Sequence, residues 1–95
     1  MSQITDDTTV VVSDETLSTT LDDEAVILHT SSGEYFGFNT VGSDIWSLID
    51  EPTTVTEITE HITDKYDVTE DRCRTDIEEL LTELVDKDLV HIVQE

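Results

Sequence analysis

The stretch Glu34–Asp50, with the sequence EYFGFNTVGSDIWSLID, decides the fold because its pattern changes from strand to helix at Asn39. The aromatic residues before Asn39 favour a β-strand. Asn39 is a good helix N-cap, and the apolar residues that follow it have helical spacing. We therefore expect a helix over Thr40–Ile49 directly after the strand. Most of the large core-filling side chains lie in this stretch, so the remaining segments are expected to pack around it.

The segments before this stretch have strand patterns. Val10–Val12 is β-branched and predicts a first strand or the approach to one. Thr16–Leu21 can continue as an extended segment, and Asp22–Asp23 is typical of a turn. The apolar run Ala25–Thr30 is too short for a helix, and a turn ending in Gly33 separates it from the aromatic strand. These two runs predict a β-hairpin.

The segments after this stretch have helix patterns. Thr54–Glu57 has the spacing of a capping box and predicts a second helix over Val55–Lys65. Thr69 is expected to cap a third helix that runs to about Asp88, and Leu89–Val93 predicts a terminal strand or an extended tail. Strands followed by helices indicate an α+β fold. We expect a helix-turn-helix-like group of three helices beside a small antiparallel sheet.

The charge balance is the most unusual feature of the composition. The 95 residues include 24 acidic and 4 basic side chains, which gives a net charge of −20. High charge with few apolar residues is typical either of disorder or of a folded protein adapted to a salty cytosol. The periodic apolar segments favour the folded protein, as one domain over residues 10–95 after a flexible acidic tail over residues 1–9. The charge argues against nucleic-acid binding, which needs a basic surface.

Several other functions are disfavoured by the residues themselves. The single cysteine, Cys73, excludes an internal disulfide, and no apolar run is long enough to span a membrane, so we expect a cytoplasmic protein. His29, His61 and His91 have no metal-ligand spacing with Cys73, and the acidic clusters match no calcium loop. No nucleophile is paired with a base. We therefore predict no metal, no cofactor and no enzymatic activity.

Two surfaces are candidates for binding. The strand before Asn39 can form an open sheet edge at Gly37, although a glycine there also suits a bulge or tight packing. The third helix has two stripes, of which the second either lines a groove or borders a wide core face in solvent. The expected core stripe is Cys73, Ile77, Leu80 and Leu84, and the second stripe is Arg74, Glu78, Leu81 and Val85.

The segment Tyr35–Asp50, with its Asn-x-x-Gly-x-x-Ile-Trp core, resembles the signature of the coenzyme PQQ synthesis protein D (PqqD) family. The helix patterns after Thr54 and Asp76 are also similar, so the resemblance covers about Thr16–Val93. It implies a winged helix-turn-helix-like fold with three antiparallel strands followed by three helices. It also implies a RiPP recognition element, which is a chaperone for ribosomally made and modified peptides.

The resemblance further implies how the peptide binds. The leader of a precursor peptide would add as a strand beside the aromatic strand and lie against the third helix. The chain would then present the peptide to a radical S-adenosylmethionine enzyme or another modifying enzyme. Carried over to this sequence, the implied peptide-binding residues are Tyr35, Phe36, Gly37, Phe38, Arg74, Glu78, Leu81 and Val85.

We therefore predict a peptide-binding adaptor of PQQ-type or other RiPP biosynthesis. The alternative is a winged-helix DNA-binding transcription regulator, because a fold does not fix a function. Its only candidate DNA contacts are Arg72 and Arg74.

Overall fold

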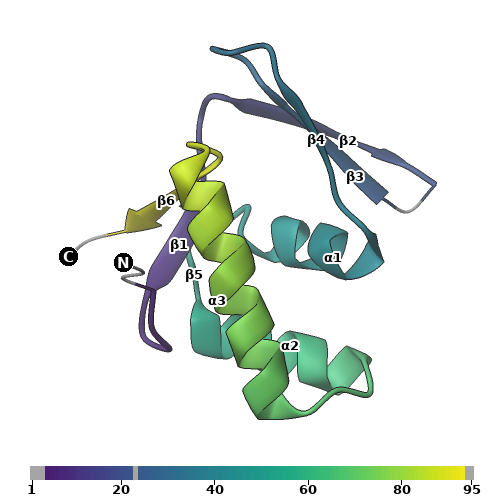
Figure 1. Ribbon diagram of the computed structural model, residues 1–95, viewed down its shortest axis with the longest axis vertical. Helices are drawn as coiled ribbons and strands as arrows, with labels where there is room; N and C mark the ends of the chain where they lie inside the picture. Colours follow the sequence, from purple (N-terminus) through teal and green to yellow (C-terminus); the bar gives the residue numbers. More distant parts are fainter. Residues whose placement is uncertain (1–3, 23, 94–95) are drawn as a thin grey trace.

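A computed structural model describes residues 4–22 and 24–93 (Figure 1). Strands and helices follow the expected order, which confirms the α+β fold with an antiparallel three-stranded sheet and three helices. One short strand lies between the first two helices, and another follows the third. The elements are β1 (Thr9–Val12), β2 (Thr16–Leu21), β3 (Glu24–His29), β4 (Tyr35–Gly37), α1 (Thr40–Leu48), β5 (Thr53–Thr54), α2 (Val55–Lys65), α3 (Glu70–Asp86) and β6 (Val90–Val93).

The first sheet has the antiparallel order β2-β3-β4. The predicted hairpin is present as β3 and β4, and Gly33 in its turn has a φ of 75°, which suits a residue without Cβ. The turn expected at Asp22–Asp23 begins at Asp22, and Asp23 lies outside the described residues. Strand β4 is at one end of this sheet, so one of its edges has no neighbouring strand among the described residues.

A second sheet has the order β5-β1-β6 and was only partly expected. Strand β6 is a strand and not an extended tail, and it pairs with β1 in the antiparallel register Val10↔Ile92. The two-residue strand β5 pairs with β1 through Thr9↔Thr54 and was missed. These pairings join segments that are far apart in the sequence, so no local pattern indicates them.

The first two helices begin with the side-chain caps that the sequence predicts, and the third does not. The Asn39 side chain accepts a hydrogen bond of 2.8 Å from the Gly42 N–H at the start of α1. The Thr54 hydroxyl and the Glu57 side chain form the predicted capping box at the start of α2. Thr69 holds the N-cap position of α3, but its side chain makes no cap hydrogen bond, so this part of the prediction was wrong.

The core lies between the helices and the two sheets, and residues before β1 contribute to it. Ile4 is buried, and the Asp6 C=O accepts a hydrogen bond of 3.1 Å from the Thr56 N–H of α2. Residues 4–9 are therefore packed against the domain, which differs from the expected tail. The first three residues of that tail lie outside the described part of the chain.

Candidate functional site

The open edge of β4 presents main-chain groups to solvent. The Glu34 C=O and the Phe38 N–H both bond to β3, at 2.9 Å each. In an antiparallel pair the bonded residues alternate, so the N–H and C=O of Tyr35 and Gly37 point away from β3. An additional strand can pair with these four groups.

Gly37 is not required by packing. A Cβ placed on it would meet no heavy atom within 4 Å, and Gly37 pairs with Val26 in the regular register of the hairpin. The alternative interpretation, in which this glycine marks a bulge or a close contact, is therefore not supported. Without a side chain, Gly37 leaves the backbone at this edge accessible.

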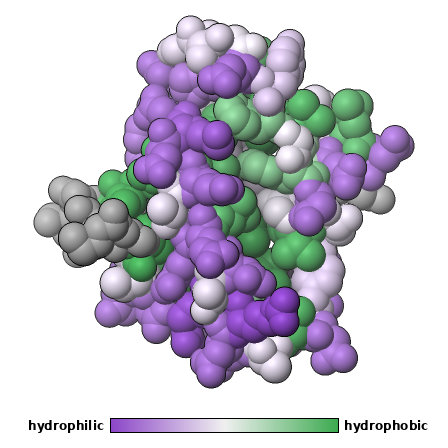
Figure 2. Space-filling model, in the orientation of Figure 1, coloured by the Kyte–Doolittle hydropathy of each residue, from purple (hydrophilic) through white to green (hydrophobic). Residues whose placement is uncertain are grey.

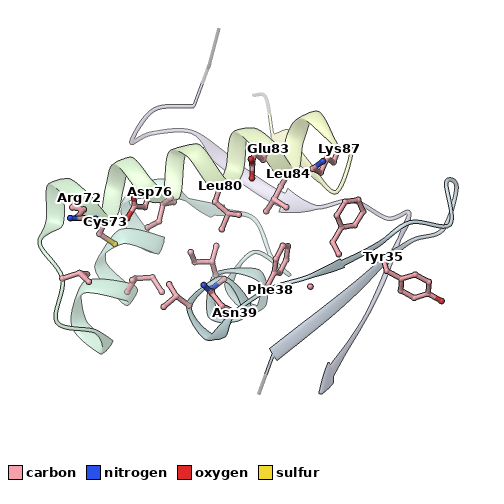
Figure 3. Close-up of a pocket in the computed structure, with 18 residues that line it drawn as sticks. Tyr35, Phe38, Asn39, Arg72, Cys73, Asp76, Leu80, Glu83, Leu84 and Lys87 are labelled. Carbon is pink, nitrogen blue, oxygen red and sulfur yellow. The ribbon is translucent and has the colours of Figure 1, made fainter. Parts of the chain in front are cut away.

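A groove of about 770 Å³ lies between the β4–α1 segment and α3 (Figure 3). In the space-filling view, apolar surface is visible beside the hydrophilic ridge of α3 (Figure 2). All four strand residues predicted to bind peptide line the groove. The lining from the strand and α1 is Tyr35, Phe36, Gly37, Phe38, Asn39, Val41, Gly42 and Ile45, and the lining from α3 and its C-cap is Arg72, Cys73, Asp76, Ile77, Leu80, Glu83, Leu84 and Lys87.

Aromatic contacts hold the strand side of the groove in place. Phe38 packs against Trp46 of α1 with ring centroids 5.6 Å apart. The Lys87 ammonium group lies 5.6 Å from the centroid of the Phe36 ring, which is a cation–π distance. Tyr35 also lines the groove, but its ring is 71% exposed and projects away from the other lining side chains (Figure 3). The two phenylalanines therefore fix the edge, and Tyr35 is free to contact a ligand.

The helix side of the groove differs from the expected one. Arg74, Glu78, Leu81 and Val85 do not line the groove. Leu81 is fully buried in the core, whereas Leu80, assigned to the core stripe, is partly buried and lines the groove. Cys73, Ile77 and Leu84 of the expected core stripe are buried as expected and also line the groove. One face of α3 therefore supplies both part of the core and the wall of the groove.

Arg74 has a structural role in this arrangement. Its guanidinium lies 2.9 Å from a carboxylate oxygen of Asp6, 2.9 Å from one of Glu70 and 3.8 Å from one of Asp71. The contact with Asp6 connects the segment before β1 to α3. Arg74 therefore stabilises the packing of this segment on α3. Among the described residues, no ion pair joins Arg74 to Glu78.

Two basic residues mark the ends of the groove, and neither of them was assigned to a peptide-binding surface from the sequence. Arg72 and Lys87 line opposite ends of it (Figure 3). Neither forms an ion pair within residues 4–22 and 24–93, whereas Lys65 pairs with Asp44 at 2.8 Å. The groove therefore holds both cations that the described residues leave unpaired. The sequence did contain a signal for both residues. Arg72 is one position from Cys73 and Lys87 is three positions from Leu84, so each lies close to the apolar stripe of α3.

Cys73 lines the groove, and its buried surroundings disfavour the thiolate form. Burial raises the pKa of the Cys73 thiol, and the nearby Asp76 carboxylate raises this pKa further. The thiol is therefore protonated at neutral pH, and only a thiolate is an effective nucleophile.

Among the described residues, no helix is both long and apolar enough to cross a membrane.

Comparisons with known proteins identify the family. Residues 24–90 match the family described as coenzyme PQQ synthesis protein D (PqqD). TbiB1 in complex with the TbiA(beta) leader peptide has a similar structure, with a TM-score of 0.82 and 36% sequence identity, over 90% of this chain and 99% of that chain. A search of curated proteins found no match.

A second solved structure supports the fold alone. The lasso peptide synthetase B1 complexed with the leader peptide has a TM-score of 0.78 and 22% identity, over 86% of this chain and 96% of that chain. The family match covers more than half of the chain, and TbiB1 is similar over nearly the whole length of both proteins. The chain therefore belongs to the PqqD family.

Proposed function

We propose that this chain is a RiPP recognition element that binds the leader of a precursor peptide as an additional strand on β4. The observation that carries the proposal is the outward-pointing main chain of Tyr35 and Gly37 beside the groove. Strand addition takes its affinity from main-chain hydrogen bonds and its specificity from side-chain pockets. TbiB1, at 36% identity, has been solved with the TbiA(beta) leader peptide.

The groove determines how many peptide residues it can hold and which side chains, apolar or acidic, suit it. Arg72 and Lys87 are 15 positions apart on α3 and its C-cap, which is about 22 Å along the helix axis. An extended chain covers this distance in about six or seven residues. Leu80 and Ile77 supply an apolar wall, and Arg72 and Lys87 can pair with carboxylates at the two ends of the segment.

The bound peptide would then be presented to a peptide-modifying enzyme in the cytoplasm. Members of the PqqD family act as adaptors and not as enzymes, and the protonated Cys73 thiol agrees with this role. A radical S-adenosylmethionine enzyme of PQQ-type biosynthesis and another RiPP-modifying enzyme are the two candidate partners. The chain itself needs no cofactor for this function.

No structural observation favours the alternative of a DNA-binding regulator. Arg74 is neutralised by three carboxylates, and Arg72 lies at the groove beside Asp76. The described residues therefore offer no basic surface to the phosphates of DNA, and neutralising phosphates supplies most of the affinity of such proteins.

Substitutions at Gly37 test strand addition. Gly37→Pro removes an outward N–H, and proline is tolerated on edge strands because that N–H bonds to no neighbour in the fold. We expect binding of the leader peptide to weaken by about twofold to tenfold, since one lost hydrogen bond is worth about 0.5–1.5 kcal/mol. Gly37→Ala keeps the N–H, and its Cβ points into open space, so it is the matched control.

The measurement is an amide NMR titration in molar KCl with the leader of a precursor peptide encoded beside the gene for this chain. Shifts concentrated at residues 35–38 and along α3 between Arg72 and Lys87 are expected. Equal affinities of Gly37→Pro and Gly37→Ala, both folded, would exclude this edge as the binding site.

A further inference from the structure

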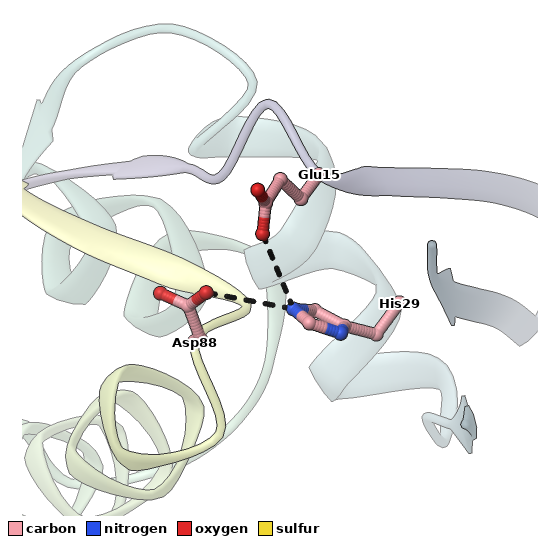
Figure 4. Close-up of side chains that lie close together, drawn as sticks. All are labelled: Glu15, His29 and Asp88. Carbon is pink, nitrogen blue, oxygen red and sulfur yellow. Dashed lines mark ion pairs between the residues drawn. The ribbon is translucent and has the colours of Figure 1, made fainter. Parts of the chain in front are cut away.

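Three polar side chains outside the groove converge on one point (Figure 4). Glu15 lies in the connection between β1 and β2, His29 is the last residue of β3, and Asp88 lies in the turn between α3 and β6. The His29 Nε2 atom is 3.9 Å from Glu15 Oε2 and 3.5 Å from Asp88 Oδ2. The fold thus brings together an imidazole and two carboxylates from distant parts of the sequence.

The His29 ring is buried, and one of its nitrogens has no hydrogen-bond partner. Its side chain is 9% exposed. The Nδ1 atom lies 3.0 Å from Ser32 Oγ and accepts a hydrogen bond of 3.3 Å from the Ser32 N–H. The Nε2 atom makes no hydrogen bond within the described part of the chain and points at the two carboxylates. A buried polar atom without a hydrogen bond is uncommon in native proteins and needs an explanation.

We infer that Glu15, His29 and Asp88 form a binding site for a divalent transition-metal ion of the Zn²⁺ class. An imidazole nitrogen with two carboxylate oxygens is a donor set that suits Zn²⁺. Calcium and magnesium prefer oxygen ligands alone, so the buried nitrogen disfavours them. The three ligand atoms lie within 4.8 Å of one another.

The distances fit a tetrahedral ion after a small movement of the carboxylates. Zinc bonds of about 2.0–2.2 Å place neighbouring ligand atoms about 3.4 Å apart in a tetrahedron. The separation of 3.5 Å from His29 to Asp88 meets this value, and the 3.9 Å to Glu15 exceeds it slightly. Both carboxylates are more than half exposed, at 55% and 56%, so they can move and water can take the fourth position.

The residues of the β3–β4 turn can orient the metal ligands. A metal bound at Nε2 requires the proton on Nδ1, which would then donate to the Ser32 hydroxyl at 3.0 Å. The Ser32 backbone N–H, which donates to Nδ1 at 3.3 Å, would give up this hydrogen bond when the metal binds. The Ser31 hydroxyl donates to Glu15 Oε2 at 3.1 Å, and the Thr30 N–H donates to the Glu15 C=O at 2.8 Å. Three consecutive residues of the β3–β4 turn thus orient two of the three ligands.

Zinc titration of the full chain by calorimetry tests the inference without any peptide, so it is independent of the proposed function. High salt in a non-chelating buffer screens the general attraction of cations to an acidic surface. We expect one saturable equivalent of Zn²⁺, and visible absorption bands of tetrahedral cobalt when Co²⁺ replaces it.

Asp88→Asn is the decisive variant. Asp88 has a φ of 62°, a conformation that asparagine adopts readily, so the fold is expected to remain. Loss of this ligand should weaken Zn²⁺ binding about tenfold or more. Asp86→Asn makes the same change of charge two positions away, at an exposed residue outside the cluster, and should leave the affinity unchanged.

His29→Gln removes the nitrogen ligand and should also abolish the tetrahedral cobalt bands. Equal Zn²⁺ affinities of Asp88→Asn and Asp86→Asn, with both variants folded by circular dichroism, would overturn the inference. Weak binding of many equivalents without a saturable one would overturn it as well, because such binding is general attraction to the acidic surface.

Discussion

At the scale of single residues, the Asn-x-x-Gly pattern has a direct physical cause. Asn39 caps α1 by accepting the Gly42 N–H, and this places Gly42 against Phe38. A Cβ on Gly42 would lie 3.1 Å from the Phe38 Cβ and 3.3 Å from the Asn39 Oδ1. The glycine is therefore needed for close contact and not for an unusual backbone angle. Asn39 as the N-cap was predictable from the sequence, but this contact was not.

Gly42→Ala is expected to destabilise the protein despite the better helix propensity of alanine. The gain in propensity is about 1 kcal/mol, whereas overpacking against the backbone-anchored Phe38 Cβ costs about 1–3 kcal/mol. We expect a net loss of about 1 kcal/mol in the free energy of unfolding, measured with urea. Gly37→Ala meets no atom and is the control, and a more stable Gly42→Ala would contradict this account.

At the scale of elements, the sequence predicts the helices better than their orientation. Helical spacing places Leu80 and Leu81 about 100° apart on α3, and both are apolar. Which of them faces the core depends on how α3 packs against α2 and the sheets, and no pattern within α3 contains that information. The strand side of the groove was predictable because the strand and helix patterns meet at Asn39. Arg72 and Lys87 were missed because the wrong stripe was assigned to the wall.

Asp44 of α1 connects this helix to α2 and makes stability depend on pH. Its carboxylate accepts a hydrogen bond from the Tyr66 hydroxyl and pairs with Lys65 at 2.8 Å. The Lys65 contact, followed by the Tyr66 hydrogen bond, lowers the pKa of Asp44 below its ordinary value. A lowered pKa in the folded state stabilises the fold above the unfolded pKa of about 4. This stabilisation is lost as the pH falls through the lower folded pKa.

Asp44→Asn should therefore reduce the free energy of unfolding at pH 7 and have a smaller effect at pH 3. The difference from the unsubstituted chain, measured by urea unfolding at both pH values, gives the contribution of Asp44. Asp64→Asn is the control, because Asp64 is exposed and has no ion pair among the described residues. A difference for Asp44→Asn that is constant with pH would show that its ionisation does not stabilise the fold.

At the scale of the whole molecule, the net charge of −20 opposes folding in dilute buffer. Two segments are held by contacts with distant parts of the chain. Strand β1 pairs with both β5 and β6, and the residues before it dock on α2 and α3. The fold class and the hairpin were predictable from local patterns. The second sheet and the docked residues 4–9 were not, because they depend on long-range pairing.

Salt should stabilise the chain. The range of charge repulsion falls from about 10 Å at 0.1 M salt to about 3 Å at 1 M. We expect the free energy of unfolding to rise by at least about 1 kcal/mol between these KCl concentrations, which corresponds to about 4–8 °C in Tm for a domain of this size. Thermal unfolding followed by circular dichroism measures the effect. A Tm that does not change with KCl would show that the acidic surface does not limit stability.

The open edge of β4 can in principle accept a strand from a second copy of the same chain as readily as one from a peptide. Edge-to-edge pairing of this kind leads to aggregation in many sheet proteins. Two copies that approach each other each carry a charge of −20, whereas a short peptide carries far less charge to the same edge. Mutual repulsion therefore disfavours self-association. It keeps the edge available for a small partner, although the described residues place no protecting bulge or covering loop there.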